Sequence, residues 1–112
     1  MTAQALKGHL DLLVLAVLSE GPRHGYAVID LLKERSGDVF DLPEGTVYPV
    51  LHRLEKAGFL ASDWGTGEGR PRRTYRLTER GGKALVERHT AWQDFSRAVG
   101  NVVGGAPWPK LT

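Results

Sequence analysis

The most regular pattern of apolar and polar positions lies between residues 41 and 64, in the middle of the chain. Four apolar residues recur there at the spacing of one helix face, and the opposite face carries hydroxyl and basic side chains. Gly58 follows the last turn, where a glycine commonly ends a helix. Any surface helix shows such a pattern, so it does not by itself indicate a function. The pattern predicts an amphipathic helix over about 44–57, with a buried stripe of Val47, Val50, Leu51 and Leu54.

A second pattern, directly after this helix, predicts a β-hairpin. Residues 60–64 and 74–77 carry the large side chains of short strands, and the loop G-T-G-E-G-R-P-R-R between them excludes regular structure. A glycine-rich, arginine-tipped hairpin after an amphipathic helix is typical of a winged helix-turn-helix, in which the helix enters the DNA major groove. The hairpin, called the wing, then places its cations on phosphates or in the minor groove. The expected wing covers about 64–74 and carries Arg70, Arg72 and Arg73.

Two further helices are expected before the central one. Residues 10–18 are apolar on several sides, which predicts a helix buried on several sides. Residues 25–35 predict a second helix, and His24 at its start is interpreted as a capping or loop residue rather than a ligand. Tyr26 can pack inward or reach a DNA phosphate with its hydroxyl, and we favour packing.

Two prolines make the start of the central helix irregular. Pro43 suits a first helical turn, and Asp41 with Glu44 can form a capping box there. Pro49 lies deeper and would disrupt a helix that begins at Pro43. Either the regular helix begins nearer Gly45, or its first turn is distorted.

The last helix is predicted over 79–103, with Thr78 as its N-cap. Apolar residues recur along it every seven positions, as they do in helices that pack against a partner helix. Arg88 stands where a further apolar residue would complete this seam. We expect the seam to form one side of a dimer contact, and packing on the protein's own core is the alternative. The residues of the seam are Leu85, Trp92, Phe95 and Val99.

These elements give an expected organisation in three parts. A winged helix-turn-helix domain covers 1–78, the dimerisation helix covers 79–103, and 104–112 form a tail. The tail contains two prolines and is expected to be flexible. The expected fold class is mainly α with a small β-hairpin.

Composition sets broad limits on this interpretation. With 112 residues, the chain is long enough for one domain with one hydrophobic core. Its net charge of +2 is too small to indicate a nucleic-acid partner, so the position of the basic residues must carry that inference. The chain has no cysteine, which excludes disulfides and fits a reducing compartment. The apolar run 10–18 is too short to span a bilayer, so we expect a soluble, cytoplasmic protein.

The sequence carries no recognised catalytic pattern. It lacks a phosphate-binding loop, an H-E-x-x-H motif and a nucleophile elbow. The G-x-G at Gly65 and Gly67 lies between two strands rather than between a strand and a helix, so it does not fit a dinucleotide site. The four histidines lack metal-ligand spacing. We predict that the protein is not an enzyme and that it needs no cofactor and no metal.

Three segments together resemble the PadR-like family of transcriptional regulators. They are G-P-R-H-G-Y-A-V at 21–28, G-T-V-Y-P-V-L-H-R-L-E-K-A-G at 45–58 and G-R-P-R-R-T-Y-R-L-T at 69–78, in the family's order and spacing. The resemblance implies a winged helix-turn-helix repressor that binds a two-fold DNA operator as a homodimer. It also implies a C-terminal dimerisation helix.

The candidate site residues follow from these patterns and from the resemblance. Many relatives respond to small aromatic compounds, so we hypothesise that Trp92 and Phe95 stack on an aromatic effector. The alternative function is a winged-helix module that binds a protein partner without sequence-specific DNA binding. The candidate DNA contacts are Thr46, Tyr48, His52 and Arg53 on the central helix and Arg70, Arg72 and Arg73 in the wing.

Overall fold

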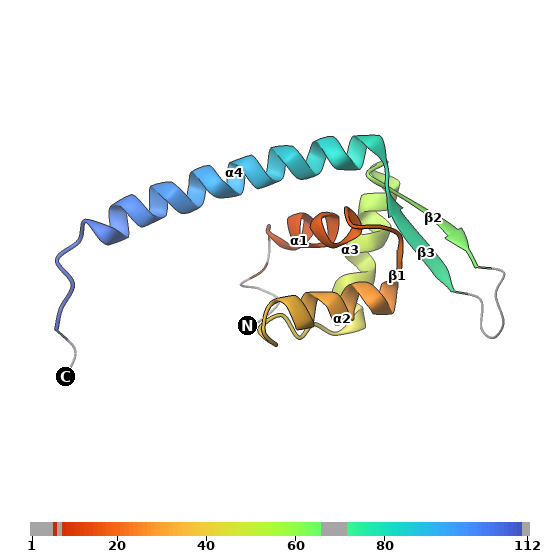
Figure 1. Cartoon of the computed structure of the whole chain (residues 1–112), viewed down its shortest axis with the longest axis horizontal. Coiled ribbons are helices and arrows are strands. Elements are labelled where there is room, and N and C mark those ends of the chain that lie inside the picture. Colours follow the sequence, from red (N-terminus) through yellow and green to blue (C-terminus); the bar gives the residue numbers. More distant parts are fainter. Residues whose placement is uncertain (1–5, 7, 66–71, 111–112) are drawn as a thin grey trace.

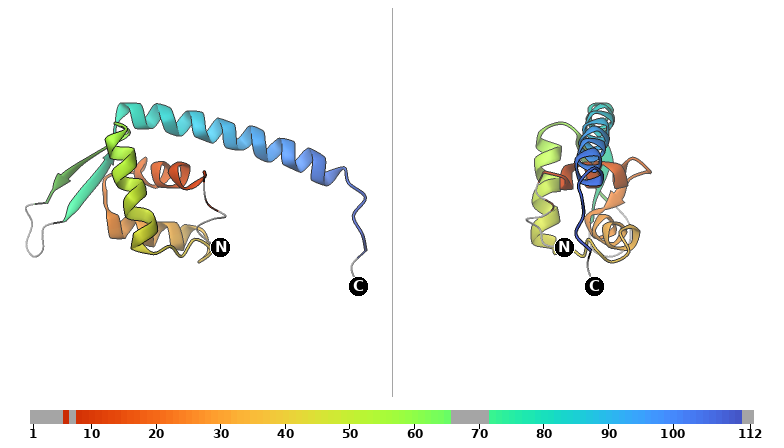
Figure 2. Two further views of the ribbon diagram at one scale, coloured as in Figure 1. Left: turned by 180° about the vertical axis from the view of Figure 1, so that it is seen from behind. Right: turned by 90° about the vertical axis from the view of Figure 1, so that its left-hand side faces the viewer.

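The computed structural model describes residues 6, 8–65 and 72–110, and these residues form four helices and a small antiparallel sheet (Figure 1). The predicted fold class, mainly α with a small β-hairpin, is confirmed. The first three helices and the sheet form a compact body, and the last helix crosses this body and projects beyond it (Figures 1 and 2). The elements are α1 (Leu10–Leu18), β1 (Arg23–His24), α2 (Gly25–Arg35), α3 (Glu44–Lys56), β2 (Leu60–Trp64), β3 (Arg73–Leu77) and α4 (Glu79–Gly104).

The hydrophobic core lies where α1, α2 and α3 meet, and β2, β3 and the first turns of α4 complete it. Val14 and Leu15 of α1 have no exposed surface, which fits the prediction of a helix buried on several sides. The predicted stripe of α3 is buried at all four positions. The stripe thus attaches α3 to the core and leaves its opposite side to solvent.

The sheet contains a strand that the sequence did not reveal. Its order is β1-β3-β2, with all neighbours antiparallel. The predicted hairpin is present, and its register pairs Leu60 with Leu77 and Trp64 with Arg73. The two-residue strand β1 adds to the other edge of β3 by pairing Arg23 with Tyr75. A strand this short has no readable periodicity, because only its pairing with β3 makes it extended.

The start of α3 settles the question that the two prolines raised. The helix begins at Glu44 and continues through Pro49, with Pro43 in the N-cap position. Pro49 is the sixth residue of the helix, and its missing N–H leaves the Gly45 carbonyl without its intrahelical hydrogen bond. The capping box expected from Asp41 is absent, since no side chain caps this helix, and Asp41 lies 3.9 Å from Lys33 instead. That prediction was wrong because Pro43 occupies the N-cap position.

The start of α4 is fixed by Thr78 and Gly81. The Thr78 hydroxyl accepts a hydrogen bond from the Gly81 N–H at 3.0 Å and donates one to the Gly58 carbonyl at 2.7 Å, so the predicted N-cap is confirmed. A Cβ on Gly81 would lie 2.0 Å from the Phe59 carbonyl oxygen. Gly81 therefore allows α4 to approach the chain that leaves α3. Its neighbour Gly82 has no such role, because a Cβ there would meet nothing within 4 Å.

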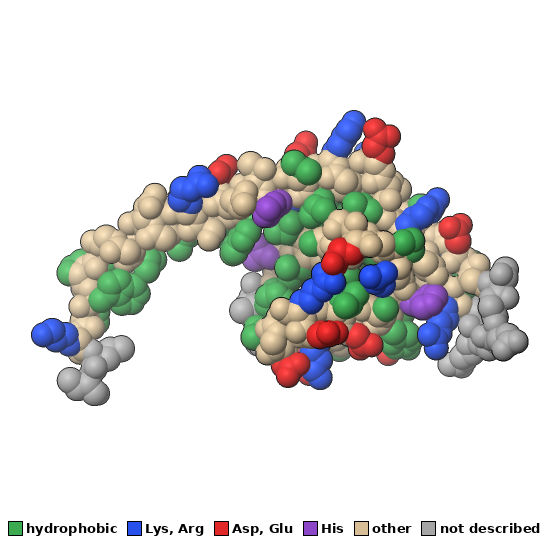
Figure 3. Space-filling view, viewed as in Figure 1, with side chains coloured by type: hydrophobic (Ala, Val, Ile, Leu, Met, Phe, Trp, Pro, Cys, Tyr) green, Lys and Arg blue, Asp and Glu red, His purple; other side chains and the backbone are tan. Residues whose placement is uncertain are grey.

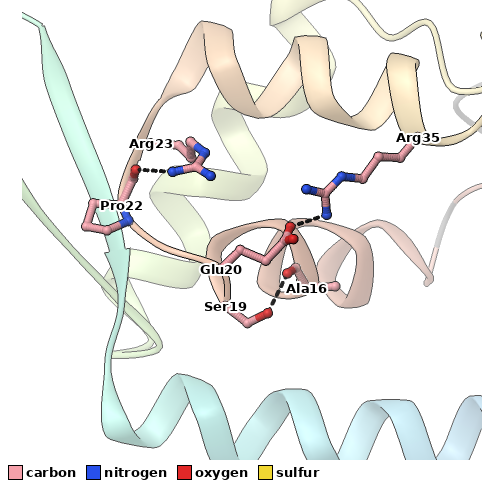
Figure 4. Close-up of polar contacts among 6 residues, drawn as sticks. All are labelled: Ala16, Ser19, Glu20, Pro22, Arg23 and Arg35. Carbon is pink, nitrogen blue, oxygen red and sulfur yellow. Dashed lines mark hydrogen bonds and ion pairs between the residues drawn. The ribbon is translucent and has the colours of Figure 1, made fainter.

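A polar corner joins α1 to α2 (Figure 4). The Ser19 hydroxyl donates to the Ala16 carbonyl at 2.6 Å, at the end of α1. The Glu20 carboxylate pairs with the guanidinium of Arg35 from the last turn of α2. The Glu20–Arg35 pair lies between α1 and α2 and connects them (Figure 4).

The projecting part of α4 is exposed along its whole circumference in the protomer, as are the following residues up to 110. Hydrophobic side chains lie along its lower edge in Figure 3. Trp92, Phe95 and Val99 of the predicted seam are 42%, 58% and 42% exposed, whereas Leu85 packs against the core. In the segment predicted to be a flexible tail, Trp108 donates from Nε1 to the Val103 carbonyl at 2.8 Å and so satisfies one carbonyl at the end of α4. None of the described helices combines the length and the apolar character that a membrane span requires.

Candidate nucleic-acid interface

The outer side of α3 has two flanks that differ in chemistry. One flank carries Tyr48 and His52, which are one turn apart. The other flank carries Thr46 and Arg53. The two flanks are distinct because Tyr48 and Arg53 lie about 140° apart around the helix axis. Thr46 and Tyr48 are half-buried, whereas His52 and Arg53 are exposed. The sequence analysis grouped these four residues as one surface, but the structure places them on two separate flanks of α3.

The Tyr48 flank is aromatic. The Tyr48 ring meets Tyr26 of α2 edge to face at a centroid distance of 6.0 Å and His52 at 6.3 Å. Burial raises the pKa of the Tyr48 hydroxyl, which therefore remains a neutral donor at physiological pH. Tyr26 packs on Tyr48 and still exposes 54% of its surface. The start of α2 and the middle of α3 thus present one aromatic face with hydroxyl and imidazole groups at its rim.

The Arg53 flank carries an ion pair. Nη1 and Nη2 of Arg53 donate to the two carboxylate oxygens of Asp11 in α1, at 2.9 and 2.6 Å. These hydrogen bonds lower the pKa of Asp11, against the opposing effect of its burial. Nη2 of Arg88 lies 3.7 Å from the same carboxylate. Arg53 therefore does not point freely into solvent, although its side chain is 59% exposed.

The wing is joined to α3 at its root. The Ser62 hydroxyl of β2 donates to the Glu55 carboxylate of α3. Arg72 is exposed just before β3, whereas Arg73 belongs to β3 and is half-buried. The Arg73 guanidinium lies 5.2 Å from the centre of the Trp64 ring, its cross-strand partner. The predicted contact Arg70 lies outside the described residues.

His24 connects the wing to α2. It occupies the N-cap position of α2, as predicted, but its side chain makes no capping bond. Its Nδ1 lies 3.1 Å from the Thr74 hydroxyl of β3. In the part of the chain that the structure describes, no group of three histidine, cysteine or acidic residues could hold a metal ion.

Sequence reasoning missed two residues of this region. Trp64 was assigned only to a strand, yet it is 62% exposed at the root of the wing beside Arg73. Asp11 lies within the run 10–18, which was interpreted only as a buried helix, yet it binds the arginine that was expected to face DNA. The available signal was the position of Asp11 itself, because a carboxylate inside a buried helix requires a cationic partner.

The predicted effector residues border a shallow pocket of about 170 Å³ between α1 and α4. The Trp92 ring meets His9 edge to face at 5.2 Å and lies 6.3 Å from Phe95. The side chain of Arg88 also contributes to the wall. The lining residues are Gly8, His9, Leu12, Arg88, Ala91, Trp92 and Phe95.

Comparison with known proteins agrees with this architecture. Residues 14–87 match the family described as "Transcriptional regulator PadR-like family". A protein named "Transcriptional regulator Rv3488" from Mycobacterium tuberculosis is 42% identical over 69 residues, which cover 62% of this chain and 64% of that protein. An uncharacterized protein from Lysinibacillus sphaericus is 30% identical over 95 residues, which cover 84% of this chain and 87% of that protein.

Solved structures show the same fold. A PadR family transcriptional regulator from Eggerthella lenta has a TM-score of 0.81 and 34% identity, with 92% of this chain and 88% of that chain covered. A PadR-like transcriptional regulator from Bacillus cereus has a TM-score of 0.79 and 28% identity, with 92% and 99% covered. The similarity thus extends over 92% of the chain in both structures.

Proposed function

The chain belongs to the PadR-like family of transcriptional regulators, and we propose that it is a homodimeric repressor that binds a two-fold operator through α3 and the wing. Members of this family regulate transcription and are not enzymes, which confirms the prediction that this chain has no catalytic role. The observation that carries the proposal is the junction of α3 with the wing, where Ser62 binds Glu55. This junction holds an exposed helix face and an arginine-bearing hairpin in one unit.

The α3 contacts to DNA divide along the two flanks of the helix. We assign groove contacts to Tyr48 and His52, which stand on the aromatic flank of α3, and a backbone or groove contact to Thr46. For Arg53 we propose a phosphate contact rather than a base contact. The Asp11 carboxylate already accepts one N–H from each terminal nitrogen of Arg53. Only the remaining N–H groups of the Arg53 guanidinium can therefore bind DNA.

The wing contributes cations. Arg72 is exposed and suits a phosphate contact, as does Arg70 in the undescribed part of the loop. Arg73 is stacked on Trp64, so we assign it to the edge of the DNA backbone next to the wing root. These contacts are independent of base identity, because phosphates carry no sequence information.

Homodimerisation is proposed through the exposed seam of α4. Among the described residues, Trp92 contacts His9, yet Trp92, Phe95 and Val99 remain 42%, 58% and 42% exposed. Monomeric proteins rarely expose contiguous apolar patches of this kind. Leu85 sits at the inner end of the seam against the protomer's own core, so we assign it the edge of the contact. A two-fold dimer presents two α3 helices, which suits two half-sites about 34–36 Å apart or a multiple of that.

An aromatic effector would bind at the pocket beside Trp92 and Phe95. Both rings border this pocket, and a flat apolar compound can stack on them. The compound releases DNA only if it binds the DNA-incompetent arrangement of the dimer more tightly. Repression then follows from occupancy, because a dimer on a promoter excludes RNA polymerase. We assign a protein with this role to the cytoplasm.

Binding of the purified protein to a randomised duplex library tests the proposal. We expect selection of two-fold sites and affinity that falls steeply with salt, as phosphate contacts require. Light scattering of the free protein should give twice the chain mass. A well-folded protein without salt-dependent affinity for any duplex would contradict the proposal and would favour a protein-binding module.

A further inference from the structure

Asp11 lies at the meeting point of three helices. Its side chain, on the first turn of α1, is 18% exposed and accepts two hydrogen bonds from Arg53 of α3. Its Oδ2 also lies 3.7 Å from Nη2 of Arg88 in α4. Within residues 6, 8–65 and 72–110, no other ion pair joins α1 to α3 or to α4. One carboxylate therefore makes the ionic contact to both the proposed recognition helix and the proposed dimer helix.

Arg88 extends this connection to the seam. Its guanidinium lies 5.2 Å from the ring centre of Phe59, in the turn that leaves α3, and its side chain lines the same pocket as Trp92. Trp92 follows Arg88 by about one helical turn. Arg88 interrupts the apolar seam, and its guanidinium instead lies near the Asp11 carboxylate and the Phe59 ring. Ionic contacts thus run from Arg88 through Asp11 to Arg53, and Arg88 lines the same pocket as Trp92 of the seam.

We propose that Asp11 is a positioning residue that holds α3 at a fixed angle to α4. The proposal rests on the proposed function, because the angle matters to DNA only if α4 joins two protomers and α3 enters a groove. In a two-fold dimer, α4 fixes how the protomers meet, and the angle between α3 and α4 then fixes the distance between the two recognition helices. A bidentate arginine–carboxylate pair suits this task, since it restricts orientation as well as distance.

Distances between spin labels on α3 and α4 test the positioning directly. The chain has no cysteine, so Lys56→Cys and Thr90→Cys create two labelling sites at exposed positions of α3 and α4. The labelled chain is mixed with an excess of unlabelled chain, so that the measured distance lies within one protomer. Asp11→Asn keeps the shape of the side chain and removes its charge, and we expect it to broaden the distance distribution.

Glu20→Gln is the matched control. It removes the carboxylate of a second arginine–carboxylate ion pair, at the corner between α1 and α2. The partner of Glu20 is Arg35 of α2, so this pair makes no contact with α3 or α4. We expect it to leave the distance distribution unchanged. Arg88→Gln preserves the Asp11–Arg53 pair and should also broaden the label-distance distribution. This variant therefore tests the positioning role of Asp11 even if Asp11→Asn does not fold. A distribution as narrow in Asp11→Asn and Arg88→Gln as in the unaltered protein would overturn the proposal.

DNA affinity gives the second readout, measured on duplexes that the unaltered protein selects from a randomised library. We expect Asp11→Asn to remain a dimer and to bind these duplexes several-fold more weakly, with a broader range of accepted half-site spacings. Unchanged affinity and spacing despite broadened label distances would overturn the functional part of the inference. Failure of the unaltered protein to bind DNA would instead refute the proposed function, and the label distances would still decide whether Asp11 positions α3.

Discussion

The hydroxyl of Tyr48 lies against Gly25, so closely that a Cβ on residue 25 would come within 2.5 Å of the hydroxyl oxygen and 2.6 Å of the ring carbon that bears it. Gly25 is the first residue of α2, and Tyr48 stands on the outer flank of α3. The absence of a side chain at position 25 therefore lets α3 hold an aromatic hydroxyl at the start of α2. This relationship links a backbone requirement in one helix to a proposed DNA contact in another.

Gly25→Ala should displace the Tyr48 side chain. We expect it to reduce the free energy of operator binding more than the free energy of unfolding. The added methyl group meets a side chain at the protein surface, which can rotate away, so we expect a stability loss of about 1 kcal/mol or less. Operator affinity should fall as Tyr48 and its neighbour His52 leave their positions. Fluorescence anisotropy on selected duplexes and thermal unfolding measure the two effects. Gly82→Ala is the control, and equal DNA affinity of both variants would contradict the role given to Tyr48.

Gly81→Ala and Gly82→Ala should have opposite effects on stability. A Cβ at position 81 would lie 2.0 Å from the Phe59 carbonyl oxygen, which belongs to the backbone and cannot rotate away. Overpacking of this kind costs roughly 1–3 kcal/mol. At position 82 an added Cβ meets nothing within 4 Å, so the gain in helix propensity should stabilise the protein by roughly 0.5–1 kcal/mol. Urea unfolding of both variants checks the sign, and a destabilised Gly82→Ala would refute this account of α4.

These glycines show why part of the fold could be predicted and part could not. The helix boundaries follow from local signals such as the stripe of α3 and the Thr78 cap, and the structure agrees with them. From the sequence alone, Gly81 and Gly82 look equivalent, because each lowers the helix propensity of the first turn of α4. Their real difference depends on the Phe59 carbonyl, which the sequence places more than twenty residues away. Contacts of that kind arise only from the packing of elements.

Asp11 should make stability depend on pH in the acid range. Arg53 holds the folded pKa of Asp11 below the ordinary value, so the charged form is favoured in the folded state. This contribution is present above the pKa of the unfolded chain and is lost as the pH falls through the lower folded pKa. Asp11→Asn should therefore lose more stability at pH 7 than at pH 2.5. The control is Asp63→Asn, which removes an exposed carboxylate 3.6 Å from Arg76, and a similar pH profile for both variants would contradict the prediction.

Replacement of Trp92 and Phe95 together by alanine should abolish dimerisation. Both side chains are exposed in the protomer, so their loss leaves the core intact and the fold should persist. Light scattering should then give the mass of one chain, with an unchanged circular dichroism spectrum. Val86→Ala is a suitable control, because Val86 is 65% exposed on α4 but lies outside the seam. A double variant that remains a well-folded dimer would show that the protomers meet elsewhere.

The proposed site was less predictable than the fold, and Arg53 shows the reason. Helical spacing placed Arg53 outside the buried stripe, which is correct, since it is an exposed residue of α3. Spacing within one helix cannot show what lies beside that flank, and here it is the Asp11 carboxylate of α1. The aromatic flank was hidden for the same reason, because Tyr26 and Tyr48 come from different helices. Sequence patterns identify the outer side of a helix, whereas the neighbours of each flank depend on the tertiary fold.

Arg72 and His52 should contribute to DNA binding in different ways. Arg72 is an exposed cation at the end of the wing loop, so we assign it to a phosphate. Arg72→Ala should weaken binding to every duplex alike and reduce the slope of log affinity against log salt by about one. His52 stands on the outer flank of α3 beside Tyr48, where it can reach a base edge. His52→Ala should cost roughly 1–3 kcal/mol on the operator and relax the preference at one position of each half-site.

Titrations of both variants against operator and scrambled duplexes, at several salt concentrations, separate the two roles. Lys33→Ala is the control for a lost positive charge, because Lys33 pairs with Asp41 near the end of α2, away from the wing. It should leave the salt slope unchanged, since a charge that contacts no phosphate releases no counterion. A salt slope that Arg72→Ala does not alter would remove this part of the wing from the DNA interface. A His52 variant that loses affinity equally for both duplexes would instead assign His52 to the DNA backbone, and base recognition would then have to come from other residues of α3.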